Sequence, residues 1–211
     1  MSVAVITIAT MSATVINYHP GMVRWEPNAR GRLEQAALAL YGERGFENTT
    51  VAEIAQRAGL TERTFFRHFA DKREVLFGGG SALEELIVCT VADAPDSLAP
   101  IDAVAAGLEA AGARFFVQER RAFSRQRQTV IAANPELQER ELIKLASLSS
   151  ALADVLRRRG VKDPAASLTA EVGLAVFRTA FERWIDETDD RDFPQLVTES
   201  LDELKAVAAG G

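Results

Sequence analysis

Few side chains in this sequence could perform acid–base, nucleophilic or metal chemistry. The 211 residues include two histidines, His19 and His68, and one cysteine, Cys89. A lone cysteine cannot form an internal disulfide. The glycine run at 78–80 has no lysine after it, so it does not match a phosphate-binding loop. These absences argue against an enzyme, a bound cofactor and a metal centre.

A denser set of polar groups lies within residues 49–69, where a glycine joins two short helical patterns. Thr50 and Glu53 have the spacing of a capping box, in which each side chain accepts a hydrogen bond from the other residue's N–H. Gly59 is placed to end this helix, because glycine adopts the left-handed conformation without steric cost. A second helix is expected to begin after Thr61.

The second helix is predicted to have an inner and an outer side. Phe65 and Phe69 are four residues apart and share the inner side. The outer side carries charged and hydrogen-bonding groups, namely Glu62, Arg63, Thr64, Arg67 and His68. Arginine, threonine and histidine on a helix directly after a glycine turn are typical of a helix-turn-helix, whose second helix enters the DNA major groove.

The elements around this pair are also predicted to be helices. Apolar residues at helical spacing indicate a helix over residues 28–44, before Gly45 and the core anchor Phe46. Proline and glycine signals place further helices at 101–121, 122–133, 135–159, 164–187 and 194–207. No strand or repeat is evident, so we predict an all-α fold. Residues 28–69 alone are near the lower size limit for an independent core and should pack on the rest of the chain.

The start of the fourth helix is ambiguous. Asp71 and Glu74 repeat the capping spacing and predict a helix that starts there at once. Gly78, Gly79 and Gly80 then follow, and each glycine inside a helix costs about 1 kcal/mol relative to alanine. They mark a break, a weak point or a plain loop before the pattern resumes over 82–91.

Residues 1–22 carry no charge and lack both a helical period and the features of a signal peptide. Translation starting at Met11 or Met22, a disordered arm and a loosely packed tail all fit this segment.

The charges of the chain are divided unevenly. Residues 23–77 hold nine Lys and Arg against eight Asp and Glu, although the whole chain has a net charge of −6. No apolar run is long enough for a transmembrane helix, and Cys89, expected in the core, suits a reducing cytoplasm.

Residues 29–77 closely resemble the DNA-binding domain of TetR-type (tetracycline-repressor-like) transcriptional regulators. The resemblance rests on GF at 45–46, TT at 49–50, VAEIA at 51–55, AG at 58–59, HF at 68–69 and DK at 71–72. It covers about a quarter of the chain. Beyond it, the helices match the family in number, order and length. The resemblance implies a helix-turn-helix domain at 23–77 and a helical effector-binding and dimerisation domain at 78–211.

The resemblance also implies roles for individual residues toward operator DNA. Thr50 and Thr61 would meet phosphates, in addition to capping their helices. Arg63, Thr64 and Arg67 would face base edges, whereas His68 and Lys72 would hold the DNA backbone. Phe66 departs from the family, which commonly has tyrosine there. A phenyl ring cannot donate to phosphate, so its contact would be apolar, with sugar or a thymine methyl group.

Two further sites follow from the resemblance. A homodimer would pair the last two helices through Phe177, Ala180, Phe181, Trp184, Leu196, Leu201 and Leu204, although an intramolecular core must account for some of these. A small-molecule effector pocket would be lined by Cys89, Phe115, Phe116, Phe123 and Leu145, each of which is also compatible with ordinary core. Arg114, Arg121 and Arg125 would face an anionic ligand or pair with acidic residues.

The leading hypothesis is therefore a ligand-responsive repressor that a small molecule releases from its operator. The alternative is a constitutive DNA-binding regulator or activator without an effector. Either protein would work in the cytoplasm, without a membrane partner.

Overall fold

The computed structural model describes residues 29–186 and 191–210, and every regular element in these ranges is a helix. The predicted all-α fold is confirmed. The alternatives for residues 1–22 fall outside the described residues.

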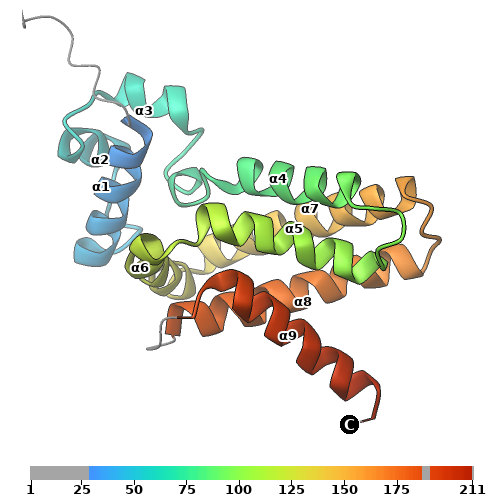
Figure 1. Ribbon diagram of the computed structural model, residues 1–211. Helices are drawn as coiled ribbons and strands as arrows, with labels where there is room; N and C mark the ends of the chain where they lie inside the picture. The colour runs from blue at the N-terminus through green and yellow to red at the C-terminus, as the bar shows by residue number, and fades with distance from the viewer. Residues whose placement is uncertain (1–28, 187–190, 211) are drawn as a thin grey trace, which may run out of the picture.

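Three helices form the N-terminal unit, which is residues 29–77 and lies at one end of the molecule (Figure 1). They are α1 (Ala29–Arg44), α2 (Val51–Arg57) and α3 (Glu62–His68). A short 3₁₀ turn, η1 (Glu74–Leu76), closes the unit. The two predicted helices of the helix-turn-helix are both present, with the predicted glycine between them.

The remaining helices form the C-terminal bundle, which is residues 80–208. They are α4 (Gly80–Asp93), α5 (Pro100–Phe115), α6 (Arg121–Ala132), α7 (Pro135–Arg158), α8 (Ala165–Asp186) and α9 (Phe193–Ala208), with a 3₁₀ turn, η2 (Gln118–Arg120), before α6. Helices α4, α5, α7 and α8 run lengthwise next to one another, and the end of α9 projects from the bundle (Figure 1). Helix α6 lies at the end of the bundle next to α1 of the N-terminal unit.

The prediction that α4 begins at Asp71 is wrong, because the glycines break it. The Asp71 carboxylate does accept from the N–H groups of Arg73 at 2.8 Å and Glu74 at 3.1 Å, but only η1 follows. A Cβ atom added at Gly78 would lie 2.8 Å from the Phe69 ring. A Cβ atom added at Gly79 would have no other atom within 4 Å. Gly78 therefore allows a close approach to the N-terminal unit.

The helix predicted over 101–121 is interrupted. It ends at Phe115, and Phe116 leaves the helical conformation with φ −110° and ψ 52°. The Phe116 ring packs 4.5 Å from the Phe193 ring and 5.6 Å from the Trp184 ring, measured between centroids. Contact with these distant aromatic residues replaces the continuous helix that local sequence favours.

Two hydrophobic cores divide the fold, and their boundary does not follow the chain. The core of the N-terminal unit contains Leu33, Ile54 and Phe65, each fully buried. Val130 and Ile131 of α6 and Leu137 of α7 belong to the same core. The expectation that the N-terminal unit packs on the rest of the chain is confirmed, since the C-terminal bundle supplies part of its interior.

Truncating Ile131 should therefore destabilise the N-terminal unit from outside it. Ile131 is 0% exposed, and removing a buried isoleucine side chain to alanine costs about 2–5 kcal/mol. We expect Ile131→Ala to lower the free energy of unfolding by that amount, measured by urea denaturation followed by circular dichroism. Thr129→Ala, at an exposed position of the same helix, should change it by less than about 0.5 kcal/mol; equal effects of the two variants would contradict a shared core.

Candidate nucleic-acid interface

Hydrogen bonds at the N-termini of α2 and α3 hold the two short helices in place. Thr50 Oγ1 accepts from the N–H of Glu53 at 3.2 Å, and Glu53 Oε2 accepts from the N–H of Thr50 at 2.9 Å, which confirms the capping box. Hydrogen bonds from Thr50, first its backbone N–H and then its hydroxyl, lower the pKa of Glu53. Thr61 caps α3 in the same way, accepting from the N–H of Thr64 at 3.2 Å.

The turn between α2 and α3 depends on one glycine and one arginine. Gly59 has φ +65°, in the left-handed region that favours glycine. Its missing Cβ would lie 2.8 Å from Nη2 of Arg32. The Arg32 guanidinium, which comes from α1, donates to the carbonyl of Ala58. A side chain at Gly59 would therefore strain the backbone and crowd the arginine that ties α1 to the turn.

Burial confirms the predicted inner and outer sides of α3. Phe65 and Phe69 are 0% and 4% exposed and belong to the core of the N-terminal unit. Of the residues predicted to face outward, Glu62, Arg63 and Arg67 are exposed, whereas Thr64 and His68 are half-buried. Phe66 is exposed as well. The outer side of α3 thus presents two guanidinium groups, a hydroxyl and a phenyl ring on a capped helix.

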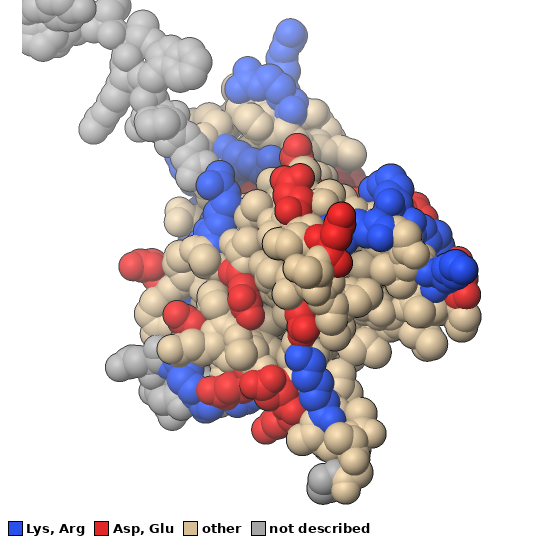
Figure 2. All heavy atoms as spheres, turned by 45° about the vertical axis from the view of Figure 1, so that its right-hand side comes forward, with Lys and Arg blue, Asp and Glu red and all other residues tan. Residues whose placement is uncertain are grey.

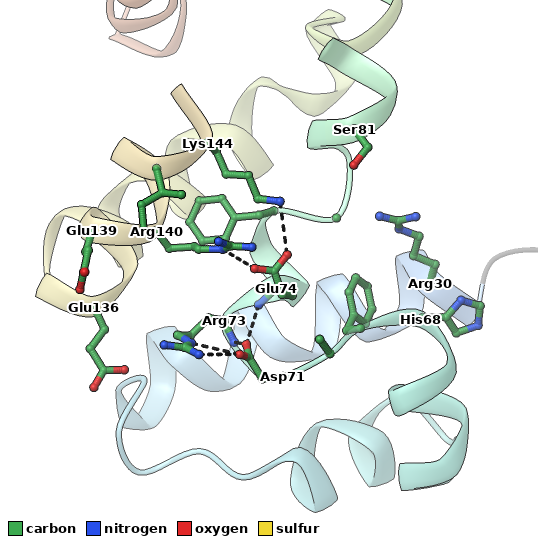
Figure 3. Close-up of a pocket in the computed structure, with 15 residues that line it drawn as sticks. Arg30, His68, Asp71, Arg73, Glu74, Ser81, Glu136, Glu139, Arg140 and Lys144 are labelled. Atoms are coloured by element: carbon green, nitrogen blue, oxygen red, sulfur yellow. Dashed lines mark hydrogen bonds and ion pairs between the residues drawn. The ribbon is translucent and has the colours of Figure 1, made fainter. Parts of the chain in front are cut away.

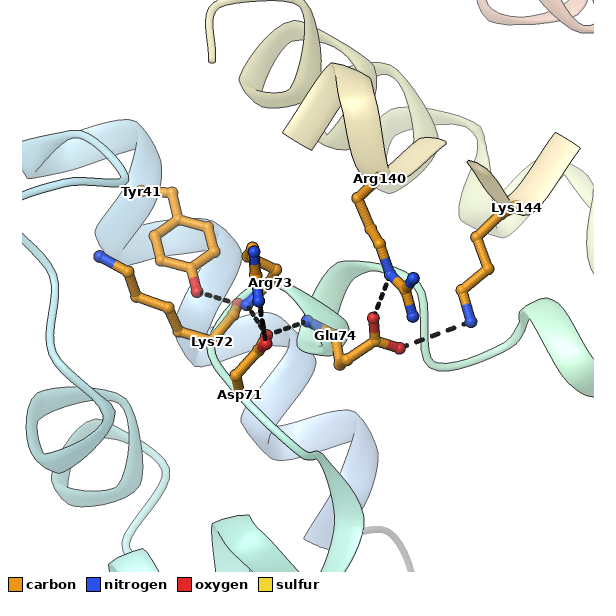
Figure 4. Close-up of polar contacts among 7 residues, drawn as sticks. All are labelled: Tyr41, Asp71, Lys72, Arg73, Glu74, Arg140 and Lys144. Carbon is orange, nitrogen blue, oxygen red and sulfur yellow. Dashed lines mark hydrogen bonds and ion pairs between the residues drawn. The ribbon is translucent and has the colours of Figure 1, made fainter. Parts of the chain in front are cut away.

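Lys72, for which the resemblance implied a contact with the DNA backbone, makes several contacts within the N-terminal unit. Its Nζ donates to the carbonyls of Phe46 at 2.9 Å, Thr49 at 3.3 Å and Glu47 at 3.4 Å, and it lies 4.3 Å from the centre of the Phe46 ring. The Tyr41 hydroxyl donates to the Lys72 carbonyl at 2.6 Å (Figure 4). Lys72 therefore anchors the loop that leads into α2.

His68 is half-buried at the end of α3, and its Nε2 is buried without a hydrogen-bond partner. The side chain lines a cleft of about 490 Å³ between the N-terminal unit and α7 (Figure 3). Arg30, Glu74, Arg140 and Lys144 line the same cleft. The expected contact of His68 with the DNA backbone competes with this inward position.

Cationic side chains of α6 and α7 hold η1. The carboxylate of Glu74 pairs with Arg140 and lies 3.5 Å from Lys144 Nζ (Figure 4). Arg127 of α6 donates from Nε to the carbonyl of Leu76 at 2.7 Å. Together these five residues form the η1 clasp. Sequence reasoning missed it, because no local pattern pairs Glu74 with a residue 66 positions away.

Arg127 is the least exposed of the three cations in the η1 clasp. Its guanidinium lies 4.9 Å from the centre of the Phe77 ring and 3.4 Å from the Glu141 carboxylate. Burial lowers the pKa of Arg127, and the nearby Glu141 partly opposes that shift. The contact with the Phe77 ring and the hydrogen bond to the Leu76 carbonyl hold the last residue of η1 and the residue that follows it.

The face of the molecule in Figure 2 carries charges of both signs. Basic side chains lie mainly at its top and right, and acidic side chains mainly between and below them. This agrees with the near-balanced charge of residues 23–77 counted from the sequence. A unit with so little net charge does not produce a broad positive field, so individually placed cations matter more than total charge for any contact with an anionic polymer.

Two family matches account for most of the chain. Residues 34–77 match the family described as "Bacterial regulatory proteins, tetR family". Residues 98–209, more than half of the sequence, match the family described as "MftR C-terminal domain". The chain belongs to the tetR family of bacterial transcriptional regulators. The helix-turn-helix resemblance noted in the sequence is thereby confirmed.

Individual relatives agree with this assignment. The regulator MftR of Mycobacterium tuberculosis, provisionally named for mycofactocin biosynthesis, is 29% identical over 85% of this chain and 88% of its own length. TcmR of Streptomyces glaucescens is 37% identical, but the match spans only 38% of this chain and 36% of TcmR. Among solved structures, the complex of SmeT with triclosan has a TM-score of 0.60 at 21% identity, covering 85% of this chain and 90% of SmeT, a Stenotrophomonas maltophilia repressor.

The residues predicted to line an effector pocket in this tetR-family chain do not come together. Cys89 is exposed on α4, so its expected place in the core is wrong. Phe123 packs against the core of the N-terminal unit, whereas Phe115, Phe116 and Leu145 pack against the core of the C-terminal bundle. Helical spacing alone could not assign these side chains to one core or the other.

The three arginines considered for an anionic ligand have other contacts. Arg121 donates to the carbonyl of Arg191 at 3.0 Å, and Arg125 donates to the carbonyl of Ile185 at 2.5 Å. Arg114 lies 5.7 Å from the centre of the Phe115 ring. Arg121 and Arg125 thus hold the end of α8 and the start of α9.

Most residues predicted for the dimer interface lie in the core of the single chain. Five of them are buried there: Phe177, Ala180, Trp184, Leu196 and Leu201. Phe181 is half-buried, and Leu204 is 37% exposed. Intramolecular packing therefore uses most of the apolar surface that the sequence assigned to a partner. Of the predicted set, only Phe181 and Leu204 keep apolar surface that a partner subunit could cover.

Among residues 29–186 and 191–210, no group of histidine, cysteine and acidic side chains could hold a metal ion. No helix in the same ranges is long and apolar enough to cross a membrane.

Replacing Lys72 should lower the stability of the fold rather than change DNA recognition directly. Hydrogen bonds from a charged donor contribute about 1.5–3 kcal/mol, so Lys72→Ala is expected to lower the free energy of unfolding in urea by roughly that amount. Lys162→Ala removes an exposed lysine and should leave stability unchanged within about 0.5 kcal/mol. Unchanged stability in Lys72→Ala, together with a shallower salt dependence of DNA binding, would instead support the phosphate contact.

Proposed function

We propose that this regulator is a homodimeric repressor that binds an operator through the outer side of α3 and leaves it when a small molecule binds the C-terminal bundle. The observation that carries the proposal is the outer side of α3, where exposed Arg63 and Arg67 stand on a capped helix against a buried Phe65 and Phe69. It would act on DNA in the cytoplasm, and no enzymatic step is needed.

The base-reading groups are assigned from chemistry. Arginine can donate two hydrogen bonds to O6 and N7 of guanine, so Arg63 and Arg67 are proposed to read guanines in the major groove. The Thr64 hydroxyl, which lies 3.0 Å from the Thr61 hydroxyl, can donate or accept at a neighbouring base edge. The Thr61 hydroxyl can donate to a phosphate while it accepts from the N–H of Thr64. The Thr50 hydroxyl donates to Glu53 Oε2 at 2.9 Å, so it would exchange that hydrogen bond for one to phosphate.

The dimer is proposed to form through the exposed part of α8 and α9. Leu204 and Val207 are 37% and 77% exposed, on the end of α9 that projects from the bundle (Figure 1). Of the α8 residues predicted for the interface, Phe181 is the one that is half-buried rather than buried in the core of the single chain. A two-fold axis here would pair like surfaces of two copies, as a symmetric dimer requires.

Release by an effector is proposed to act through the η1 clasp. Two recognition helices fit successive major grooves when their centres lie about 34–36 Å apart. A ligand that moves α6 or α7 would shift Glu74 and Leu76, and with them the N-terminal unit, by way of Arg127, Arg140 and Lys144. The structures of SmeT with triclosan and of Bacillus subtilis FadR with stearoyl-CoA each contain a ligand.

Removing one base-reading arginine should relax specificity. Arg63→Ala is expected to lose about 1–3 kcal/mol of discrimination at one base pair of each half-site, measured by titrating operator variants and random DNA. Arg158→Ala removes an exposed cation from α7 and should leave that discrimination intact. If wild-type protein binds its own promoter region no better than random DNA, the proposed function fails.

Introducing negative charge on the projecting end of α9 should dissociate the proposed dimer. Leu204→Glu combined with Val207→Glu is expected to shift the protein from dimer to monomer in sedimentation velocity, because a carboxylate is costly to bury in an apolar interface. Leu142→Glu, at a 62% exposed position on α7, serves as the control and should remain dimeric. Dissociation by the control alone would move the interface to α7.

The alternative, a constitutive binder or activator, differs in its response to ligands. Small molecules, including acyl-CoA esters and hydrophobic phenols, would be titrated into a preformed protein–operator complex and release followed by fluorescence anisotropy. Release by any class supports the repressor, whereas an operator complex that survives every class supports the alternative.

A further inference from the structure

Phe66 is an exposed apolar side chain in the middle of a polar surface. It is 56% exposed, and it is the only large hydrophobic residue exposed to this degree among residues 29–77. Water gains nothing from contact with a phenyl ring, so leaving this ring in solvent is unfavourable for the free protein. A function at the outer side of α3 would account for it.

The ring is held in a defined direction. Its centroid lies 5.5 Å from that of Phe65, with an angle of 82° between the ring planes. Phe65 is fully buried and itself packs against Phe69 at 5.5 Å. Edge-to-face contacts of this kind favour one orientation of the ring. The contact with Phe65 therefore favours the observed direction of the Phe66 ring.

Phe66 lies beside the two arginines of α3 that are proposed to read bases. Arg63 is three residues before Phe66 and Arg67 is one after it, and both are exposed. Positions 63 and 67 are about 6 Å apart along a helix axis, close to two base-pair steps of about 3.4 Å. If the two arginines read base edges, the ring between them faces the same stretch of the groove.

The chemistry of the groove then selects the base. A phenyl ring offers no hydrogen bond, so it would leave the polar edge of guanine, cytosine or adenine unpaired. The one methyl group on a base edge of the major groove is that on C5 of thymine. We infer that Phe66 is a specificity-determining residue that selects a thymine in each half-site by contact with its methyl group. This inference rests on the proposed function, because it requires α3 to enter the major groove.

Uracil in place of thymine tests this contact, since it removes the methyl group and leaves every hydrogen-bonding group of the base unchanged. After the operator is mapped by protection, each thymine of a half-site is replaced in turn, and affinity is measured for full-length protein. Burial of one methyl group contributes about 0.8 kcal/mol, or about fourfold in affinity. We expect one thymine, within about two base pairs of a guanine lost to Arg63→Ala or Arg67→Ala, to show this loss.

Variants of Phe66 complete the test. In Phe66→Ala the same uracil replacement should change affinity by less than about 1.5-fold, as the contact is already gone. Phe66→Gln, which keeps length but not the apolar ring, should be equally insensitive. Leu142→Ala, an exposed apolar residue on α7, should retain the full wild-type effect. Thermal unfolding of each variant confirms that it is folded.

Two results would overturn the inference while leaving the proposed function intact. One is an operator in which no uracil replacement matters. The other is an effect of uracil that persists in Phe66→Ala and Phe66→Gln. A uniform loss of affinity for all DNA in Phe66→Ala, without any thymine dependence, would reassign the ring to sugar packing. Failure to find a specific operator at all would remove the proposed function itself.

Discussion

The contact between η1 and the cations of α6 and α7 is the constraint on which the arrangement of this protein depends. Glu74 pairs with Arg140 and lies 3.5 Å from Lys144, and the Leu76 carbonyl accepts from Arg127 at 2.7 Å. Ion pairs that are partly exposed contribute only about 0–1 kcal/mol each. The η1 clasp is therefore better understood as fixing orientation than as supplying stability. It decides where the N-terminal unit sits relative to the C-terminal bundle.

Stability at the same junction comes from apolar packing. Val130, Ile131 and Leu137 are buried in the core of the N-terminal unit although they belong to α6 and α7. A three-helix unit of this size has little interior of its own, and these side chains extend it. A movement of α6 or α7 cannot leave the N-terminal unit unaffected, because the two share both a core and the polar bonds of the η1 clasp. This coupling is the physical basis on which an effector response could rest.

The outer side of α3 follows a different design. Its geometry is set locally, by the Thr50 and Thr61 caps, by the left-handed Gly59 and by Arg32 from α1. The groups that would meet DNA are few and their charge is nearly balanced across the unit. Specificity then depends on placement rather than on a strong field, and the apolar Phe66 between arginines fits that design. The proposed base-reading residues and the η1 clasp are thus separate sets of residues, joined through the short segment that contains η1.

The sequence by itself determined the features that depend on neighbours in the chain. Capping at Thr50 and Thr61, the turn at Gly59, the inner and outer sides of α3 and the all-α class were predictable, because caps, turns and helical faces are set within a few residues. The break near Gly78 was visible only as an ambiguity. The family was also predictable, since its motif lies within one short stretch of the chain.

Tertiary structure decided the features that depend on residues far apart in the chain. The Lys72 ammonium bonds to carbonyls at positions 46–49, Phe123 joins one core and Phe116 the other, and Trp184 is buried within the single chain. Each of these side chains has the same residue type and spacing in either role. An apolar face on a helix indicates that something covers it, but which element does so is settled only when the helices pack.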